Sequence, residues 1–476
     1  MHLHNAATVA LRPVRRRGIA IAILAVGSAL LVGSCANNRP HPDTETAIAS
    51  ATGIEQAVRI RTEGGPVDEP SEGDSEVSSL TLATAVRQAV TTDPGLQAAL
   101  ARVRIALADA DQARLLPNPV LNVVLRFDVS GGGKPQIEAS LAQDIVNILR
   151  IPRQSSAADH RLRQASADAV TVALDVVAEV RERYAEAQAL DRLMPVLNER
   201  HALVGKLLDA ANARLRVGEG IRPDVTTLES QRVDLEVELA AAKIQEREAR
   251  LRLARLIGEP SGGTGWRLDA WDAPKPSEHS ETQWIDTALT HRPEVQSVAW
   301  QLAALGDDAT LAQLLPWDGA SAGVNAQRDP DWAIGPSIST PVPVFDMGQA
   351  KRARITAQQI EARHNLTLAK RKVVEEVRVA YQNVSGTAAN LHRIREELIP
   401  LQERRRREAE SLYRAGQTDV TSLFLAEQDL RSIHIRAVEA ERQTVIAQIR
   451  LDRAVGGAGI AASIGTASAM PSSSTK

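Results

Sequence analysis

The chain has a single cysteine, Cys35, among its 476 residues, so no disulfide bond can form within it. The ten histidines are scattered, and no His-x-x-x-His pair or cysteine cluster offers a metal site. The four methionines form no ladder for a soft metal, and a glycine-rich phosphate loop is absent. We therefore expect no catalytic residue, no metal site, no cofactor and no enzymatic activity.

Aromatic residues are also scarce, at 3% of the chain, whereas alanine, leucine, arginine and glutamate are abundant. This composition suits long helices better than a compact globular core. The formal net charge is −3 at pH 7, which is mildly acidic. Such a charge gives no reason to expect a nucleic acid as a partner.

The first 34 residues have the pattern of a secretory signal. Four arginines between positions 12 and 17 precede an apolar stretch, Gly18 to Val32, which leads to small residues before Cys35. The apolar stretch has about 15 residues, fewer than the roughly 20 that a spanning helix needs. The ending also resembles a lipoprotein signal, in which the cysteine becomes the lipidated first residue, and Ala36 matches the form sorted to the outer membrane. An ordinary signal peptide, with Cys35 a bystander, and an uncleaved anchor are the alternatives.

Two flanking segments are predicted to lie outside the folded part. Residues 36–79 contain four prolines and an excess of acidic over basic residues, which predicts a flexible tether after Cys35. Residues 457–476 are rich in alanine, serine and glycine, which predicts a disordered tail.

The folded part reads almost the same twice. The stretch Ala89–Gln97 returns as Ala288–Gln296 and Leu115–Pro117 returns as Leu314–Pro316, both 199 residues later. Tyr184 and Tyr381 match at an offset of 197 residues. A solenoid repeat has a period of roughly 20–50 residues, so this longer period predicts two fused, pseudo-symmetric halves. Any function must be one that two equal halves can share around an axis.

Each half is predicted to begin with two short helices and a β-hairpin. In the first half the helices cover residues 81–92 and 96–116, and the second ends at Pro117-Asn118-Pro119. Residues 120–129 and 137–142 then alternate between apolar and polar side chains on either side of three glycines. Residues 320–326 and 332–338 repeat the pattern in the second half.

Two interpretations of these hairpins compete. They are either amphipathic hairpins on a soluble core, or transmembrane strands with an apolar face in lipid and a polar face in a wet lumen. Four of the twelve aromatic residues lie in or beside the strands, as interfacial girdles require. Because four strands cannot close a wet barrel, the membrane interpretation requires an oligomer.

A very long helix is predicted after each hairpin, over residues 153–217 and 349–415. At 1.5 Å per residue, about 65 residues span roughly 100 Å, several times a bilayer, so these helices must lie in water. Each ends at a glycine, Gly218 or Gly416, where a left-handed cap is expected. The chain then returns as second helices over 228–256 and 423–455. Each half is thus predicted to end in a tall antiparallel helical hairpin.

This order of elements, duplicated, resembles the outer-membrane efflux proteins of the TolC-like type. The motifs that carry the resemblance are Ser79-Leu80-Thr81-Leu82 before Asp93-Pro94, the block Leu115–Pro119, the stretch Pro341–Gln349, and Arg414-Ala415-Gly416 followed by Asp419-Val420. The resemblance covers nearly all of residues 80–456. The chain departs from the family pattern at 144–152, where a glycine is more usual at the joint between strand and helix.

The resemblance implies a mainly α fold with a small β part. The chain is then divided into six segments. They are a signal peptide (1–34), a lipidated tether (35–79), a first repeat (80–258), an equatorial connection (259–280), a second repeat (281–456) and the tail (457–476). Long helical hairpins form a periplasmic α-barrel, and four strands per protomer form a transmembrane β-barrel closed by trimerisation. The implied function is a passive exit duct in the outer membrane, lipid-anchored, working with a periplasmic adaptor and an inner-membrane transporter.

The resemblance also implies roles for the hairpin tips. Arg216, Gly218, Arg414 and Gly416 are expected at the adaptor contact, although the glycines could equally be helix caps alone. Asp419, assisted by Asp224, is expected to line the pore aperture; the alternative is that each carboxylate caps its return helix. The alternative function is a periplasmic coiled-coil scaffold lipoprotein without a pore, which leaves the four membrane-length strands unexplained.

Overall fold

The computed structural model describes residues 43–54, 59–62, 79–127, 131, 135–269, 279–328, 331–415, 417–418 and 420–457. Its contacts divide the chain into two compact units. The strand unit contains Asp111–Ser155 and Thr310–Gln349, and the helix unit contains Pro42–Ala110, Ser156–Ala309 and Ala350–Lys476. In the described part of the chain, no helix is long and apolar enough to span a bilayer.

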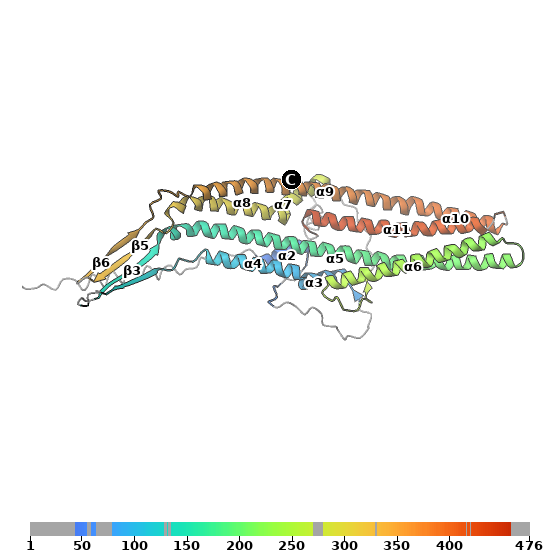
Figure 1. Cartoon of the computed structure of the whole chain (residues 1–476). Helices are drawn as coiled ribbons and strands as arrows, with labels where there is room; N and C mark the ends of the chain where they lie inside the picture. Colours follow the sequence, from blue (N-terminus) through green and yellow to red (C-terminus); the bar gives the residue numbers. More distant parts are fainter. Residues whose placement is uncertain are drawn as a thin grey trace, which may run out of the picture. The chain divides into compact units, whose positions relative to one another are not determined.

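The strand unit holds one antiparallel four-stranded sheet, drawn in Figure 1 with the order β2-β3-β5-β6. Its strands are β2 (Val120–Arg126), β3 (Gln136–Asp144), β5 (Ser321–Arg328) and β6 (Trp332–Ser339). Each repeat therefore contributes one hairpin, as predicted, and the two hairpins join where β3 pairs with β5.

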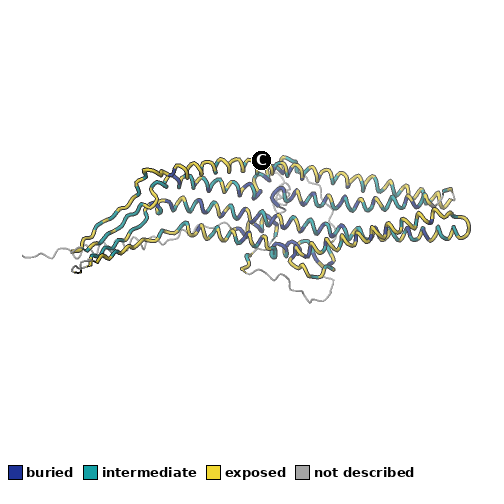
Figure 2. Tube along the Cα trace, viewed as in Figure 1, coloured by how far each residue is buried: buried dark blue, intermediate teal, exposed yellow. Residues whose placement is uncertain are grey.

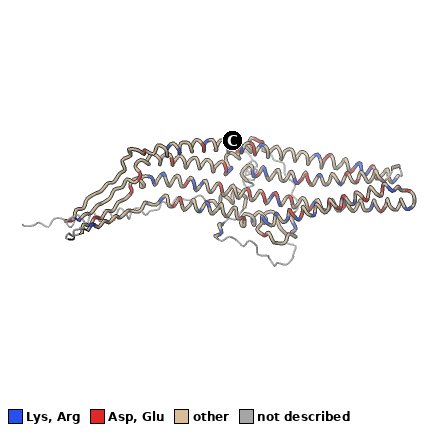
Figure 3. Tube along the Cα trace, viewed as in Figure 1, with Lys and Arg blue, Asp and Glu red and all other residues tan. Residues whose placement is uncertain are grey.

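The register of the sheet separates apolar from polar side chains. Leu141 of β3 pairs with Leu121 of β2 and with Val324 of β5, while Ser140 pairs with Asn122 and Asn325. Because successive side chains of a strand point to opposite faces, one face is apolar and the other polar. Figure 3 shows few charged residues on the strands. On the polar face Glu138 accepts hydrogen bonds from Arg126 at 3.2 Å and from Asn325 at 3.3 Å.

The helix unit confirms the duplicated order of elements. The first repeat has α3 (Leu82–Thr92), α4 (Pro94–Gln112), α5 (Ile145–Arg216) and α6 (Arg222–Leu256). The second has α7 (Glu281–His291), α8 (Pro293–Leu311), α9 (Gln349–Arg393), the π turn η3 (Ile394–Leu398), α10 (Ile399–Arg414) and α11 (Val420–Val455). A 3₁₀ turn, η2 (Ala312–Trp317), follows α8.

The helix boundaries follow local sequence signals. The Thr81 hydroxyl accepts a hydrogen bond from the Thr84 N–H and caps α3, and Ser280 with Gln283 forms a capping box on α7. Asp93 separates α3 from α4 because proline follows it and cannot continue the helix. Its carboxylate accepts the Leu96 N–H at 2.7 Å.

The buried core is duplicated like the sequence, and its residues are the dark segments of Figure 2. Val176 and Val180 of α5 lie in a cluster with Leu253 and Ile257 at the end of α6. Val373, Val377, Leu451 and Val455 occupy the equivalent places in the second cluster. Both return helices end at a glycine with positive φ, Gly258 (88°) and Gly456 (121°), a conformation that glycine adopts without strain. The same apolar positions therefore build both cores.

The first long helix begins earlier than predicted, at Ile145 instead of Arg153. The joint between strand and helix, where the chain departs from the family pattern by lacking a glycine, is formed by Asp144, the last residue of β3, which caps the helix directly. Its carboxylate accepts the Asn147 N–H at 2.9 Å. One turn further, the buried Arg150 donates to Asp318 at 2.7 Å and to the Leu314 carbonyl at 2.8 Å, which ties the two repeats together within the strand unit.

The second long helix contains a π turn that the first lacks. The repeat offset grows from 197 residues at Tyr184 and Tyr381 to 198 at Gly218 and Gly416, so this helix carries one extra residue between those points. The π turn at Ile394–Leu398 lies in that interval. A π turn accommodates one inserted residue without ending the helix, which explains the change of offset.

The tether prediction is wrong for residues 44–52. They form α2 (Thr44–Thr52), whose Ile48 and Ala51 are buried in the first core cluster. Asp43 caps this helix through the Thr46 N–H, and burial of its apolar side chains offsets the entropy of ordering it. Cys35 and residues 458–476 of the predicted tail lie outside the described residues.

Part of the connection between the repeats lies within the described residues. Its β4 (Arg267–Leu268) pairs in parallel with β1 (Ser79–Leu80), and Trp266 is buried in the first core cluster. The Tyr184 hydroxyl joins both strands to α5, since it donates to the Leu80 carbonyl and accepts the Asp269 N–H, each at 2.8 Å. Residues 270–278 of this segment lie outside the described residues.

Candidate functional site

The tip of the first helical hairpin has the predicted glycine cap. Arg216 is the last residue of α5, and Gly218 follows with φ +80°. Arg216 and Gly218 are both exposed. Their neighbours Val217 and Ile221 are also 71% and 60% exposed. The tip thus presents apolar and cationic groups together.

Asp224 does not cap the return helix. The cap position of α6 is Ile221, with no side-chain cap hydrogen bond, and Asp224 lies in the first turn. A carboxylate there is stabilised by the positive end of the helix dipole. Its side chain is exposed. The capping alternative is therefore wrong for Asp224, and its charge is free to face solvent.

The tip of the second hairpin is described in part. Arg414, the last residue of α10, is exposed and forms an ion pair with Glu410 one turn earlier. Leu412 and Tyr413 beside it are 44% and 43% exposed. Gly416 and Asp419 lie outside the described residues.

A cavity of about 390 Å³ lies between the first tip and the start of α11. Its apolar wall includes Leu207, Leu228 and Phe424, and its polar wall includes Arg214 and Asp224. The cavity joins the first repeat to the return helix of the second, which no local sequence pattern indicated. Exposed apolar residues next to a helix start were the available signal, but they became a site only through the packing of α5, α6 and α11.

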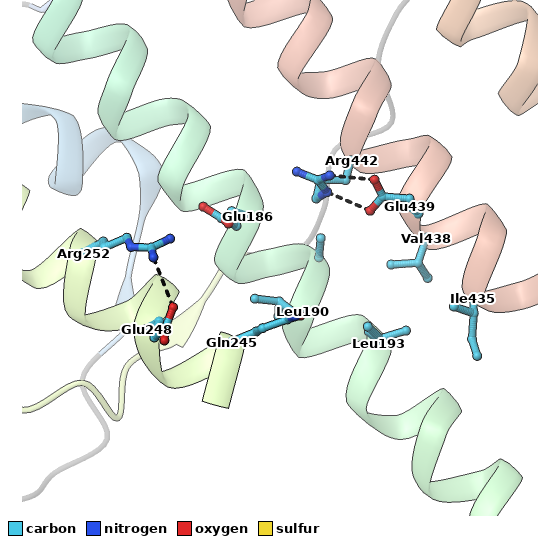
Figure 4. A pocket seen from close by; sticks show the side chains of 11 residues that line it. Glu186, Leu190, Leu193, Gln245, Glu248, Arg252, Ile435, Val438, Glu439 and Arg442 are labelled. Carbon is cyan, nitrogen blue, oxygen red and sulfur yellow. Dashed lines mark hydrogen bonds and ion pairs between the residues drawn. The ribbon is translucent and has the colours of Figure 1, made fainter. Parts of the chain in front are cut away.

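A second cavity, of about 510 Å³, lies along the same three helices. Figure 4 shows Glu248 and Arg252 of α6 on one side, Glu439 and Arg442 of α11 on the other, and Leu190 of α5 between them. Arg442 donates to both carboxylate oxygens of Glu439 at 2.6 and 2.8 Å. This hydrogen bond holds the pKa of Glu439 below its ordinary value and raises the pKa of Arg442. Glu439 and Arg442 thus neutralise each other, and so do Glu248 and Arg252, which form an ion pair at 3.1 Å.

The sheet is the other candidate surface, and its apolar face is exposed. The most exposed aliphatic and aromatic side chains of the strand unit include Phe127 (70%) and Ile338 (80%), with Leu121, Val123, Trp332 and Ile334 also exposed. Large apolar patches that face solvent mark protein or membrane contacts. Among the described residues, no group of three or more histidines, cysteines or carboxylates could hold a metal ion.

The family model for "Outer membrane efflux protein" matches residues 85–259 and 284–457, once for each repeat. The chain belongs to the outer membrane efflux protein family. Its two matched segments are the two repeats recognised in the sequence, and they leave out the connection between them. The resemblance drawn from the motifs is therefore confirmed.

Two curated relatives illustrate the membership, and one solved structure shows the same fold. The outer membrane efflux protein BepC of Brucella suis is 23% identical over 57% of this chain, and the match spans 61% of BepC. The cobalt-zinc-cadmium resistance protein CzcC of Cupriavidus metallidurans is 22% identical over 79% of this chain and 90% of CzcC. The outer membrane channel MtrE of Neisseria gonorrhoeae is 16% identical, with a TM-score of 0.63 over 85% of this chain and 98% of MtrE.

Membership confirms the mainly helical, duplicated fold and places the chain among outer-membrane efflux proteins. Membership does not test the roles predicted for individual residues. The lipid site at Cys35, the tip contacts at Arg216, Gly218, Arg414 and Gly416, and the aperture at Asp419 and Asp224 stay predictions.

Proposed function

We propose that this chain is the outer-membrane exit duct of a tripartite efflux pump and conducts cargo passively. The observation that carries the proposal is the open four-stranded sheet with one exposed apolar face. Backbone groups at an open sheet edge cannot lie unpaired in hydrocarbon. Three copies close a barrel of twelve strands, with the apolar face toward lipid and the polar face toward the lumen.

The helix unit supports the periplasmic half of the duct. In Figure 1, α6 returns along α5 and α11 returns along α10, as the walls of a helical barrel require. Helices of this charged composition belong in water, since buried charges are costly in hydrocarbon. A homotrimer would then continue the strand barrel through the periplasm as an α-barrel of twelve helical columns.

The tips are the surface proposed for the periplasmic adaptor, which links the duct to the inner-membrane transporter. Arg216, Gly218, Arg414 and Gly416 mark this surface. The exposed Val217 and Ile221, together with the 390 Å³ cavity beside them, add apolar area that an adaptor could cover. Crosslinks to the adaptor from cysteines placed at 217 and 415 would support the contact, and strong crosslinks from the helix middles alone would exclude it.

Outer-membrane attachment is proposed to involve a lipid on Cys35 as well as the sheet. The competing function is a pore-free scaffold lipoprotein. It accounts for the helices and the anchor, but it leaves the apolar face of the sheet without a purpose. The exposed face therefore favours the duct.

The decisive experiment compares neighbouring residues on opposite faces of β5. The wild type is extracted in detergent, its mass is measured, and its conductance is recorded in planar bilayers. We expect a conducting trimer. Val324→Arg, on the apolar face, should remove the protein from the membrane, whereas Asn325→Arg, on the polar face, should leave the trimer intact. A buffer-soluble monomer without its lipid, insensitive to both substitutions, would establish the scaffold instead.

A further inference from the structure

Among the described residues, the two outer strands of the sheet, β2 and β6, each pair with one other strand. Under the proposed function, β6 of one copy must pair with β2 of the next. The duplication of the chain specifies which residues meet at that junction, so the inference below rests on the proposed function and deepens it.

The two hairpins are superimposable in register. Asn122 pairs with Ser140 in the first hairpin, and Ser321 pairs with Ser339 in the second. Both members of the second pair lie 199 residues after those of the first. The motif Leu115–Pro117 returns at the same offset. Hence β2 is equivalent to β5, and β3 is equivalent to β6, residue by residue.

The junction between the repeats is β3 against β5, and the junction between copies is its equivalent. In the first, Ala139 pairs with Ala326 and Ser140 pairs with Asn325. Adding 199 to the number of a β3 residue gives its equivalent in or next to β6, and subtracting 199 from the number of its β5 partner gives the equivalent in or next to β2. Ala139 and Ala326 become Ile338 and Phe127, while Ser140 and Asn325 become Ser339 and Arg126.

We propose that β6 of each copy pairs antiparallel with β2 of the next, with Ile338 opposite Phe127 and Ser339 opposite Arg126. Beyond Ser339, where β6 ends in the single copy, an extension of the strand in the same register places Thr340 opposite Leu125 and Val342 opposite Val123. Aromatic and β-branched side chains make favourable cross-strand pairs, which suits Phe127 and Ile338. Polar Ser339 and Arg126 meet on the lumen face.

The prolines of the second hairpin agree with this edge. Pro336 lies opposite Val324 of β5 and has no N–H to donate to it. The backbone groups of Pro336 therefore point away from β5, toward the outer edge of the sheet. Residues at even positions of β6 therefore direct their N–H groups to the outer edge, because donor direction alternates along a strand. Pro341 and Pro343 fall at odd positions. The N–H of Ile338 thus stays available to the neighbouring copy, and neither Thr340 nor Val342, which follow the end of β6, is a proline.

Disulfide formation between Ser339→Cys and Arg126→Cys in one chain tests this register. Opposed residues of antiparallel strands have Cα atoms about 4.5–5.5 Å apart, within the range of a disulfide. Within one copy, β2 and β6 are three strand spacings apart, about 14 Å, so a bond can form only between copies. Ser337→Cys with Arg126→Cys, and Ser339→Cys with Val124→Cys, are matched controls shifted by two residues on the same face.

We expect a covalent trimer on non-reducing gels from the Ser339/Arg126 pair and monomers from both shifted pairs. Each single variant gives the background from Cys35. Thr340→Cys with Leu125→Cys provides a second pair in the proposed register should the loss of Arg126 impair folding. The proposed register is wrong if a detergent-stable trimer forms but crosslinks only through a shifted pair, or through neither register. The proposed duct function is not contradicted by that result. A monomeric wild type overturns the duct as well.

Discussion

Asp175 on α5 and Arg453 on α11 form an ion pair at 2.7 Å although 278 residues separate them. It belongs to a row of ion pairs along the contact of these two helices. The others are Arg181–Asp452 (2.9 Å), Glu182–Arg450 (2.9 Å), Arg192–Glu441 (2.5 Å) and Glu199–Arg431 (2.7 Å). As the α5 number rises, the α11 number falls, which is the register of antiparallel helices. The two repeats are therefore joined lengthwise by alternating charge.

Arg453 also donates to Glu294 at 2.6 Å, and this carboxylate is expected to make the fold acid-sensitive. Burial alone would raise the pKa of Glu294, but the hydrogen bond from Arg292 and the charges of both arginines lower it from 4.5 to about 2. Because the folded pKa lies below the unfolded one, the stabilisation is present above about pH 4.5 and is lost as pH falls toward 2. The difference corresponds to roughly 3 kcal/mol.

Glu294→Gln should therefore lower the thermal midpoint at pH 7, and its deficit against the wild type should shrink as pH falls from 4.5 toward 2. Glu281→Gln is the matched control, since Glu281 pairs with the exposed Arg378, and exposed ion pairs contribute little. Equal, pH-independent effects of the two substitutions would contradict the assignment. Melting curves in micelles across this pH range provide the measurement.

Tyr184→Phe should destabilise the fold more than Tyr381→Phe, its equivalent in the second repeat. The Tyr184 hydroxyl is buried and joins β1 to the end of β4. Its removal takes the donor from the buried Leu80 carbonyl, at about 1–3 kcal/mol, and the acceptor from the part-buried Asp269 N–H, which costs less because water can reach it. Tyr381 is only partly buried against the second cluster. Denaturant unfolding of both variants in detergent measures the difference; equal losses would count against the bridge.

Alkaline pH should weaken the same bridge. Burial, with added repulsion from Asp269 and Asp191, raises the pKa of Tyr184 from 10 to about 12, although the Asp269 N–H lowers it in part. A raised folded pKa means that the stabilisation is present below pH 10 and is lost as pH approaches 12. Tyr184→Phe should be less sensitive than the wild type in this window.

Gly323→Ala should disrupt the sheet, whereas Gly335→Ala should not. A Cβ at Gly323 would overlap the Leu141 carbonyl of the paired strand, and backbone cannot move aside there. A Cβ at Gly335, on the adjacent strand, meets nothing within 4 Å. The yield of detergent-stable trimer measures the effect. Similar yields from both variants would show that the β3–β5 junction tolerates a side chain.

Cys35 is expected to carry lipid, because it follows an apolar stretch and small residues typical of a lipoprotein signal. Labelled palmitate should enter the wild-type chain and not Cys35→Ser. The substitution should weaken sorting more than assembly, since the sheet also inserts in the membrane. Absence of label from the wild type would refute the lipid site.

Asp419 is expected to line the aperture as a threefold ring of carboxylates that attracts cations, with an effect that weakens as salt rises. Asp419→Asn retains capping ability but loses charge, so it should reduce cation preference and block by trivalent cations in planar bilayers. Asp224→Asn should have a smaller effect of the same sign. Unchanged selectivity in Asp419→Asn would leave only the cap.

Local patterns in the sequence were sufficient for the helices and hairpins that the two repeats share, although not for α2 or for the start of α5. Asp93-Pro94 separates α3 from α4 because proline cannot continue a helix. Gly218 ends the first long helix because a positive φ suits glycine. Alternation along β2 and β5 predicted the faces of the sheet, because successive strand side chains point to opposite sides. Each of these signals acts over a few neighbouring residues, so the sequence alone reveals it.

Only the tertiary structure decided which elements meet. The burial of α2, the bridge from Tyr184 to Asp269, and the pairing of Asp175 with Arg453 join residues far apart in the chain. The sequence offers each helical arginine many carboxylates as possible partners. Only the packing of the helices decides which of them it meets. The same holds for the tip cavity, which α11 completes with Phe424. Short-range rules specify the helices and strands, whereas contacts between distant residues exist only once the chain has brought them together.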